Sequence, residues 1–134
     1  MGLSQATQKV VSSNAGLTQW TKTFTQLTTP GSTDHIHVPG TRRHTFQVTV
    51  AEIDTNVGVT IDGSIDGTNF FVMPVKGFTA TGISYTNEIA TITGNGTYLI
   101  YAEEIAVSYV RFTFASESGG DSSATIDVKY LGSE

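Results

Sequence analysis

The chain of 134 residues contains no cysteine, so disulfides, thiolate metal sites and a cysteine nucleophile are all excluded. Basic residues are few: seven lysines and arginines stand against twelve aspartates and glutamates, and the formal net charge is −5. Electrostatic binding of a nucleic-acid backbone needs a net basic surface or a basic stripe. We therefore expect no nucleic-acid partner, and a stability that comes from packing or assembly.

Long apolar runs are also missing. No stretch approaches the roughly 20 apolar residues that a membrane-spanning helix needs, and the first residues lack the charged-then-apolar order of a signal peptide. We expect synthesis in a cytoplasm and no membrane partner. The chain has no nucleophile elbow, zinc-protease motif, phosphate loop or dinucleotide fingerprint. Glu103 and Glu104 would point to opposite faces of a strand, and we predict that the protein is not an enzyme.

Threonine and glycine are abundant instead. Threonine outnumbers the four charged residue types combined, and there are 14 glycines, a composition that favours strands and turns. Apolar and polar residues alternate from 43 to 53 and from 124 to 130, which is the period of a half-buried strand. About eight such runs, each with one apolar face, predict a two-sheet antiparallel β-sandwich that is jelly-roll-like.

The first residues differ from this pattern. Residues 1–16 are polar and aperiodic, so we predict a flexible N-terminal arm followed by a β-sandwich domain over residues 17–134. Two further connections are predicted as hairpins. Asn95-Gly96 is a strong signal for a two-residue turn, and residues 116–122 are expected to join the last two strands.

The segment Asp62-Gly-Ser-Ile-Asp-Gly-Thr-Asn69 is an acidic turn between two strand patterns. Asp62, Ser64 and Asp66 match the first half of a calcium loop, in which oxygens at positions one, three and five converge on the ion. The twelfth position is Met73 where a bidentate Glu is required, and strands flank the turn where helices should. The alternative is a β-turn whose Asp side chains accept hydrogen bonds from their own backbone.

His35 and His37 would point the same way on an extended segment. With Asp34 or His44 they could supply imidazole and carboxylate ligands for zinc or another transition metal; the alternative is a set of surface or interface histidines. A metal site would need a third ligand on a neighbouring strand, and a metal-dependent enzyme would need the imidazoles of His35, His37 and His44 to converge. We predict no metal and no cofactor, and keep both clusters as candidates.

Aromatic residues raise the possibility of glycan binding, because β-sandwich modules hold sugars on exposed rings. The available rings are Trp20, Phe70, Phe71, Tyr98, Tyr101 and Tyr109. Most of them alternate into predicted core faces, and core packing is the usual role of such side chains. A carbohydrate-binding module, with Asp62, Asp66 and Asn69 at its binding edge, is therefore the alternative function.

Three segments carry a resemblance to a known group of proteins: Arg43-His-Thr-Phe-Gln-Val48, Val59-Thr-Ile-Asp-Gly-Ser-Ile-Asp-Gly-Thr-Asn-Phe-Phe71 and Tyr109-Val-Arg-Phe112. Together they resemble small β-sandwich structural proteins encoded by tailed bacteriophages. The usual pattern there is a strand, then Gly-Ser-x-Asp-Gly-x-x-Trp, then a late Tyr-x-Arg strand. Here Phe70 stands where Trp is common.

This resemblance implies a non-enzymatic virion protein, most simply a capsid decoration or cement protein on the head surface. It further implies the major capsid protein as partner and a homotrimer as the assembly. The carbohydrate-binding alternative would fit a tail-associated module. The residues expected to contact the partner, on the arm and the adjacent rim, are Gln5, Lys9, Val10, Trp20, Arg42 and Arg43.

Overall fold

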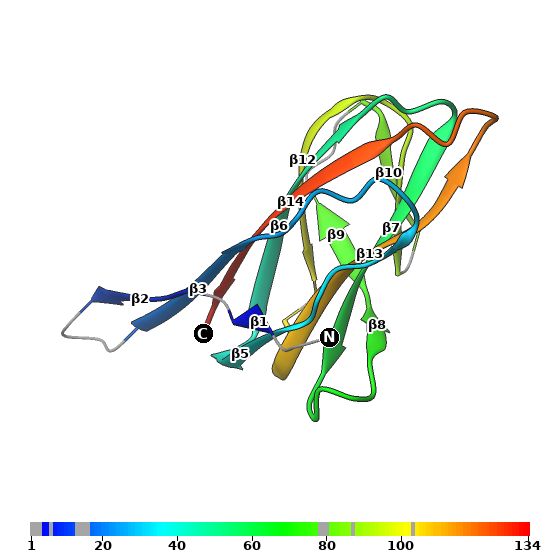
Figure 1. Ribbon diagram of the computed structural model, residues 1–134. Coiled ribbons are helices and arrows are strands. Elements are labelled where there is room, and N and C mark those ends of the chain that lie inside the picture. The colour runs from blue at the N-terminus through cyan, green and yellow to red at the C-terminus, as the bar shows by residue number, and fades with distance from the viewer. Residues whose placement is uncertain (1–3, 6, 13–16, 78–80, 87, 103) are drawn as a thin grey trace.

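The computed structural model describes residues 4–5, 7–12, 17–77, 81–86, 88–102 and 104–134, and within these ranges the chain is built from strands (Figure 1). The strands are β1 Ser4–Gln5, β2 Thr7–Ser12, β3 Leu17–Thr23, β4 Gly31–Ser32, β5 Ile36–Thr41, β6 Arg43–Ala51, β7 Asn56–Ser64, β8 Phe71–Met73, β9 Val75–Gly77, β10 Ile83–Thr86, β11 Ile89–Ile92, β12 Gly96–Ala102, β13 Val107–Ser118 and β14 Thr125–Ser133. The described ranges hold no helix that is long and apolar enough to cross a membrane.

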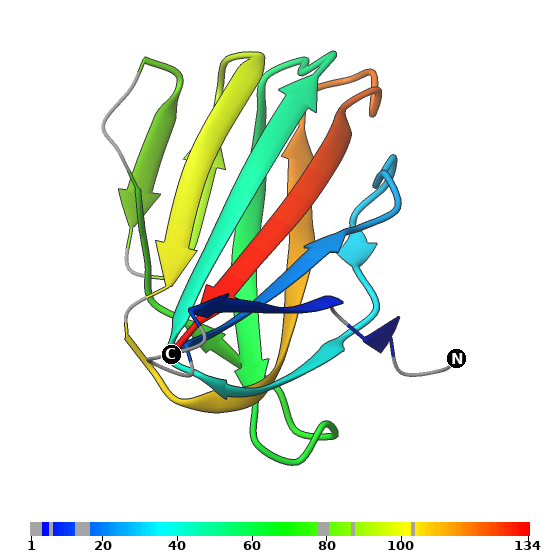
Figure 2. The same ribbon diagram turned by 90° about the vertical axis from the view of Figure 1, so that its left-hand side faces the viewer.

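Two sheets form the two layers of the sandwich. Sheet A has the order β1-β5-β13-β7-β11-β10, with β4 also pairing with β13 and β8 with β7. Sheet B has the order β2-β3-β14-β6-β12-β9. Figure 2 looks onto sheet B, with β7 and β13 of sheet A behind it. Every pairing between these strands is antiparallel apart from the short parallel pair of β1 with β5.

The chain alternates between the layers. From β5 to β7 it passes from sheet A to sheet B and back, and β11, β12, β13 and β14 again lie alternately in A and B. The resulting strand orders are those of a jelly roll, with β5-β13-β7-β11 in one sheet and β6-β12-β9 in the other. The predicted all-β sandwich is therefore confirmed.

The core lies between the inner faces of the two sheets. In β6 the buried side chains alternate with polar ones, and β13 repeats the pattern from Val110 to Phe114. Phe46 of sheet B meets Phe112 of sheet A, with ring centroids 5.8 Å apart. This ring pair joins the two layers within the core.

Two predicted hairpins are wrong. Asn95-Gly96 joins β11 of sheet A to β12 of sheet B, and residues 119–124 join β13 of sheet A to β14 of sheet B. A connection that crosses between sheets keeps the apolar face inward on both strands, so alternation alone does not distinguish it from a hairpin. The acidic turn is a true hairpin, since Asp62 pairs with Val72 across β7 and β8.

The segment predicted as an arm contains two strands. β1 pairs with the start of β5 at one edge of sheet A, and β2 pairs with β3 at one edge of sheet B. The β2–β3 pair extends away from the body of the sandwich (Figure 1). Main-chain hydrogen bonds at a sheet edge require no apolar period, which is why the sequence pattern did not predict them. The domain boundary after residue 16 stays a prediction.

Candidate functional site

The Asp66 carboxylate organises the β7–β8 turn. Its Oδ1 accepts hydrogen bonds from the backbone N–H groups of Thr68 and Asn69, both at 2.8 Å, and from the Ser64 hydroxyl at 3.0 Å. Its Oδ2 accepts one from the Asn69 side-chain amide at 2.8 Å. These bonds, chiefly those from the Asn69 and Thr68 backbone, hold the pKa of Asp66 well below its usual range. The turn therefore presents a fixed anion.

The Asp62 carboxylate points elsewhere. Its Oδ2 accepts hydrogen bonds from Arg111 Nε at 2.8 Å and from the Thr113 hydroxyl at 2.7 Å, and its Oδ1 accepts one from the Thr60 hydroxyl at 3.0 Å. The Arg111 guanidinium lies 4.3 Å from the centre of the Phe70 ring, a cation–π contact. Asp62 thus ties β7 to β13 on the outer face of sheet A.

The calcium candidates do not converge. The Ser64 hydroxyl is used within the turn, since it donates to Asp66 and accepts the Gly67 N–H at 2.9 Å. Gly67 itself has a φ of 78°, which favours glycine. No group of three His, Asp or Glu side chains in the described ranges is placed to hold a metal ion. The segment is instead a β-turn in which the Asp66 side chain accepts hydrogen bonds from the backbone of the same turn.

The three histidines also lie apart. His35 and His37 flank the Tyr109 ring, with ring centroids 5.7 and 4.7 Å away. His44 is fully buried: its Nδ1 is 2.8 Å from the Tyr130 hydroxyl and its Nε2 is 3.2 Å from the Ile105 carbonyl oxygen. Burial lowers the pKa of His44 from 6.5 to about 4, against the smaller opposing effect of the Ile105 carbonyl. His44 is a structural core residue.

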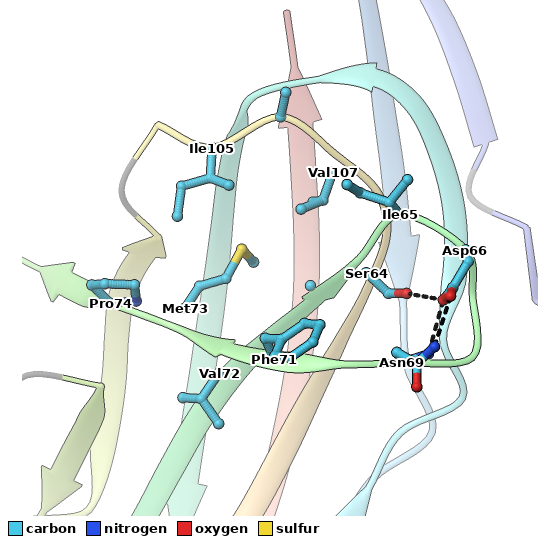
Figure 3. Close-up of a pocket in the computed structure, with 12 residues that line it drawn as sticks. Ser64, Ile65, Asp66, Asn69, Phe71, Val72, Met73, Pro74, Ile105 and Val107 are labelled. Atoms are coloured by element: carbon cyan, nitrogen blue, oxygen red, sulfur yellow. Dashed lines mark hydrogen bonds between the residues drawn. The ribbon is translucent and has the colours of Figure 1, made fainter.

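An apolar pocket of about 500 Å³ lies beside the turn (Figure 3). One wall is the β7–β8 hairpin and the other is the connection from Ile105 to Val107. Figure 3 shows Phe71 and Met73 below this space and Ile105 and Val107 above it. A Cβ on Gly63 would fall 2.7 Å from the Met73 sulfur and 3.0 Å from a Val107 methyl carbon. The absence of a side chain at Gly63 therefore allows the two walls to approach.

Three large apolar side chains around this pocket face solvent. Their exposed fractions are 77% for Ile65, 71% for Phe71 and 41% for Val72. The sequence pattern identified 70–73 as an apolar strand but did not show that its side chains are exposed. The one usable signal was the run of four consecutive apolar residues, because a strand that buries a single face should alternate. Ile105 and Val107 gave no sequence signal of a site.

The residues predicted to contact a partner are spread over several elements. The Trp20 side chain is half-buried and donates a hydrogen bond to the Pro39 carbonyl at 3.2 Å. Arg42 and Arg43 are exposed and pair with Glu104 at 3.6 and 3.3 Å. Gln5 belongs to β1, and Lys9 and Val10 belong to β2. Their role in partner binding stays a prediction.

The aromatic residues do not form a common platform. Tyr98 is buried, and Phe70 lies under Arg111. Phe71 is exposed on a strand of sheet A, whereas Tyr101, 37% exposed, belongs to sheet B. The exposed rings therefore lie on different sheets.

Comparison with known proteins gives a fold and no family. No family description matches the sequence, and no curated protein sequence does. The crystal structure of YomS, a protein derived from the SPBc2 prophage, is similar over 88% of this chain and 95% of its own, with a TM-score of 0.58 and 15% identity. The insecticidal delta-endotoxin Cry8Ea1 of Bacillus thuringiensis aligns with 81% of this chain and 19% of its own, with a TM-score of 0.36 and 13% identity. The chain thus shares the fold of YomS.

Proposed function

We propose that this protein is a non-enzymatic structural component of a tailed-bacteriophage virion, and that it decorates the head by binding the major capsid protein. The observation that carries this proposal is the exposed apolar hairpin at one end of a rigid sandwich. Clustered exposed apolar side chains around a pocket typically mark a protein interaction site. The hydrogen bonds of the Asp66 turn and the Asp62–Arg111 pair stabilise that end of the sandwich.

Two further observations support a phage setting. The chain shares its fold with a prophage-derived protein. The Gly-Ser-x-Asp-Gly pattern of its β7–β8 turn is also the pattern by which the sequence resembles small phage sandwich proteins. In this structure that pattern builds the edge of the apolar pocket, so the resemblance and the exposed surface fall on the same residues.

The physical properties of the chain suit this role. A decoration protein stabilises a shell by mass action, because it binds the assembled state and not the separated subunits. A net charge of −5 keeps the protein soluble and disfavours contact with packaged DNA. We further propose that it acts as a trimer, so that each shell contact is made three times.

The test uses empty heads assembled from the major capsid protein of the phage that encodes this chain. We expect saturable cosedimentation of the purified protein with the heads and a rise in their melting temperature. Native mass spectrometry of the free protein reports the trimer. Heads that neither bind the protein nor gain stability would refute a decoration role.

Glycan binding is the second candidate function. Phe71 favours it, because this exposed ring lies beside the polar Asp66–Asn69 turn. The polar groups of that turn are largely engaged with each other, however, and few remain to recognise sugar hydroxyls. Binding on a glycan array that is lost in Phe71→Ala would support this candidate in preference to head decoration.

A further inference from the structure

Strand β8 is an apolar sheet edge. It pairs with β7 on one side, and no strand in the described ranges pairs with its other side. Phe71 and Val72 point to opposite faces of the strand, yet both are exposed. Sheet edges are usually protected by charged residues or proline; residues 70–75 contain no charged residue, and Pro74 lies just after the end of β8. Main-chain groups and apolar side chains are therefore available together along β8.

The pocket beside β8 has the size and lining of a binding site. Its volume of about 500 Å³ lies within the range of roughly 300 to 1,000 Å³ that is usual for ligand sites. Apolar side chains from both walls line most of it, namely Ile65, Phe71, Val72, Met73, Ile105 and Val107. This space suits one or two large apolar side chains.

Asp66 adds a charge preference to this apolar surface. Its Oδ2 accepts a single hydrogen bond from protein groups, so it retains capacity for another donor. Among the described residues that line the pocket there is no Lys or Arg, and Asp66 is the one charged side chain. Arg42 and Arg43 are not among the lining residues, and both are paired with Glu104. An incoming cation therefore meets a fixed carboxylate with an unused acceptor site.

We propose that this surface binds an extended, basic segment of a partner protein. The segment adds a strand to the free edge of β8, places a large apolar side chain in the pocket and donates from a Lys or Arg to Asp66 Oδ2. Strand addition of this kind takes affinity from main-chain hydrogen bonds and specificity from side-chain pockets. The identification of the partner as a capsid protein rests on the proposed function. The chemistry of the bound segment does not rest on it.

Charge also decides against a second copy of this chain as the occupant. Two copies that paired through β8 would bring two Asp66 carboxylates to one interface and join two chains of net charge −5. Like charges at an interface oppose association. A foreign segment that carries Lys or Arg satisfies the same apolar surface and neutralises Asp66.

The experiment starts with a random-sequence peptide display library, selected on the full-length protein and counter-selected on Val72→Lys. We expect enriched peptides with a large apolar residue close to a Lys or Arg. Fluorescence anisotropy then measures the best peptide. The affinity of the parent protein for this peptide should exceed the affinity of Val72→Lys by about tenfold or more. Replacing the basic residue of the peptide with Gln should lower the affinity for the parent protein by about tenfold. Asp66→Asn should abolish the preference for the basic peptide over the Gln peptide.

Leu131→Lys is the matched control, because Leu131 is 42% exposed and Val72 41%, and Leu131 lies on sheet B. It should bind the peptide as the parent does, and the melting temperatures of both variants should agree. The proposal is overturned if no peptide is enriched, if the enriched peptides are acidic, or if Val72→Lys binds them normally. A dimer that dissociates only in Val72→Lys would assign the surface to a second copy and would also overturn it.

The head-binding assay separates this proposal from the proposed function. If heads capture the parent and Val72→Lys equally, decoration stands and the β8 surface is not its docking site. If peptides bind through β8 but heads do not capture the parent, the docking chemistry stands and the decoration role fails.

Discussion

His44 should make this protein lose stability between pH 6.5 and about pH 4. The imidazole is fully buried in sheet B, between the Tyr130 hydroxyl and the Ile105 carbonyl. Its environment accommodates the neutral ring, in which one nitrogen donates to the carbonyl and the other accepts from the hydroxyl. A proton on the second nitrogen would turn the hydroxyl contact into one between two donors, unless the hydroxyl rotates.

The size of the effect follows from the shift in pKa. Burial lowers the pKa of His44 from 6.5 to about 4. In this pH interval the unfolded chain binds a proton at this residue and the folded chain does not, so stability falls as the pH falls. The full shift corresponds to a loss of about 3 kcal/mol in the free energy of unfolding. Such a loss is a large part of the stability of a typical small domain.

The assay is urea unfolding at a series of pH values across this interval, for the parent and for His44→Gln. Glutamine keeps a neutral amide at the site and has no proton to gain, so the variant should be less stable at neutral pH but should lose much less on acidification. The steepest slope expected for the parent is about 1.4 kcal/mol per pH unit. Equal slopes in the two proteins, or an imidazole that titrates near 6.5 by NMR, would refute this reasoning.

Three further predictions concern the turn, the Asp62 pair and the first strands. The depressed pKa of Asp66 contributes stability that is present above pH 3.8 and lost as the pH falls below it. The melting temperature of Asp66→Asn should therefore depend less on pH in that range than the melting temperature of the parent. Added calcium should leave the parent's melting temperature unchanged. Asp62→Ala should lower the free energy of unfolding, measured with urea, by about 2 to 3 kcal/mol, because Arg111 and two hydroxyls lose their acceptor. A loss under about 0.5 kcal/mol would contradict this prediction. Deletion of residues 1–16 removes β1 and β2 from the sheet edges. Circular dichroism should show that the sandwich is still folded, but the shortened protein should no longer cosediment with heads. Unchanged capture by heads would exclude these strands from docking.

The sequence determined the class of fold because alternation is a local property. In β6, His44 and the apolar residues Phe46, Val48 and Val50 are buried, as the period of two predicts. The acidic turn was likewise predictable, because Asp and Gly at these positions favour a tight turn whatever surrounds them. The late Arg111 strand was found by pattern, but its ion pair with Asp62 was not, because the two residues are far apart in the chain.

Tertiary structure decided which strands pair, which connections cross and which apolar residues remain exposed. The Asn95-Gly96 turn has the local chemistry of a hairpin, yet packing of the two sheets sends β12 to the opposite layer from β11. Phe71 and Val72 are apolar and lie in a strand, but they are exposed because β8 pairs only with β7 among the described strands. Exposure and pocket formation depend on what lies across from a residue in space. The docking surface therefore appears only when the β7–β8 hairpin and the Ile105–Val107 connection come together.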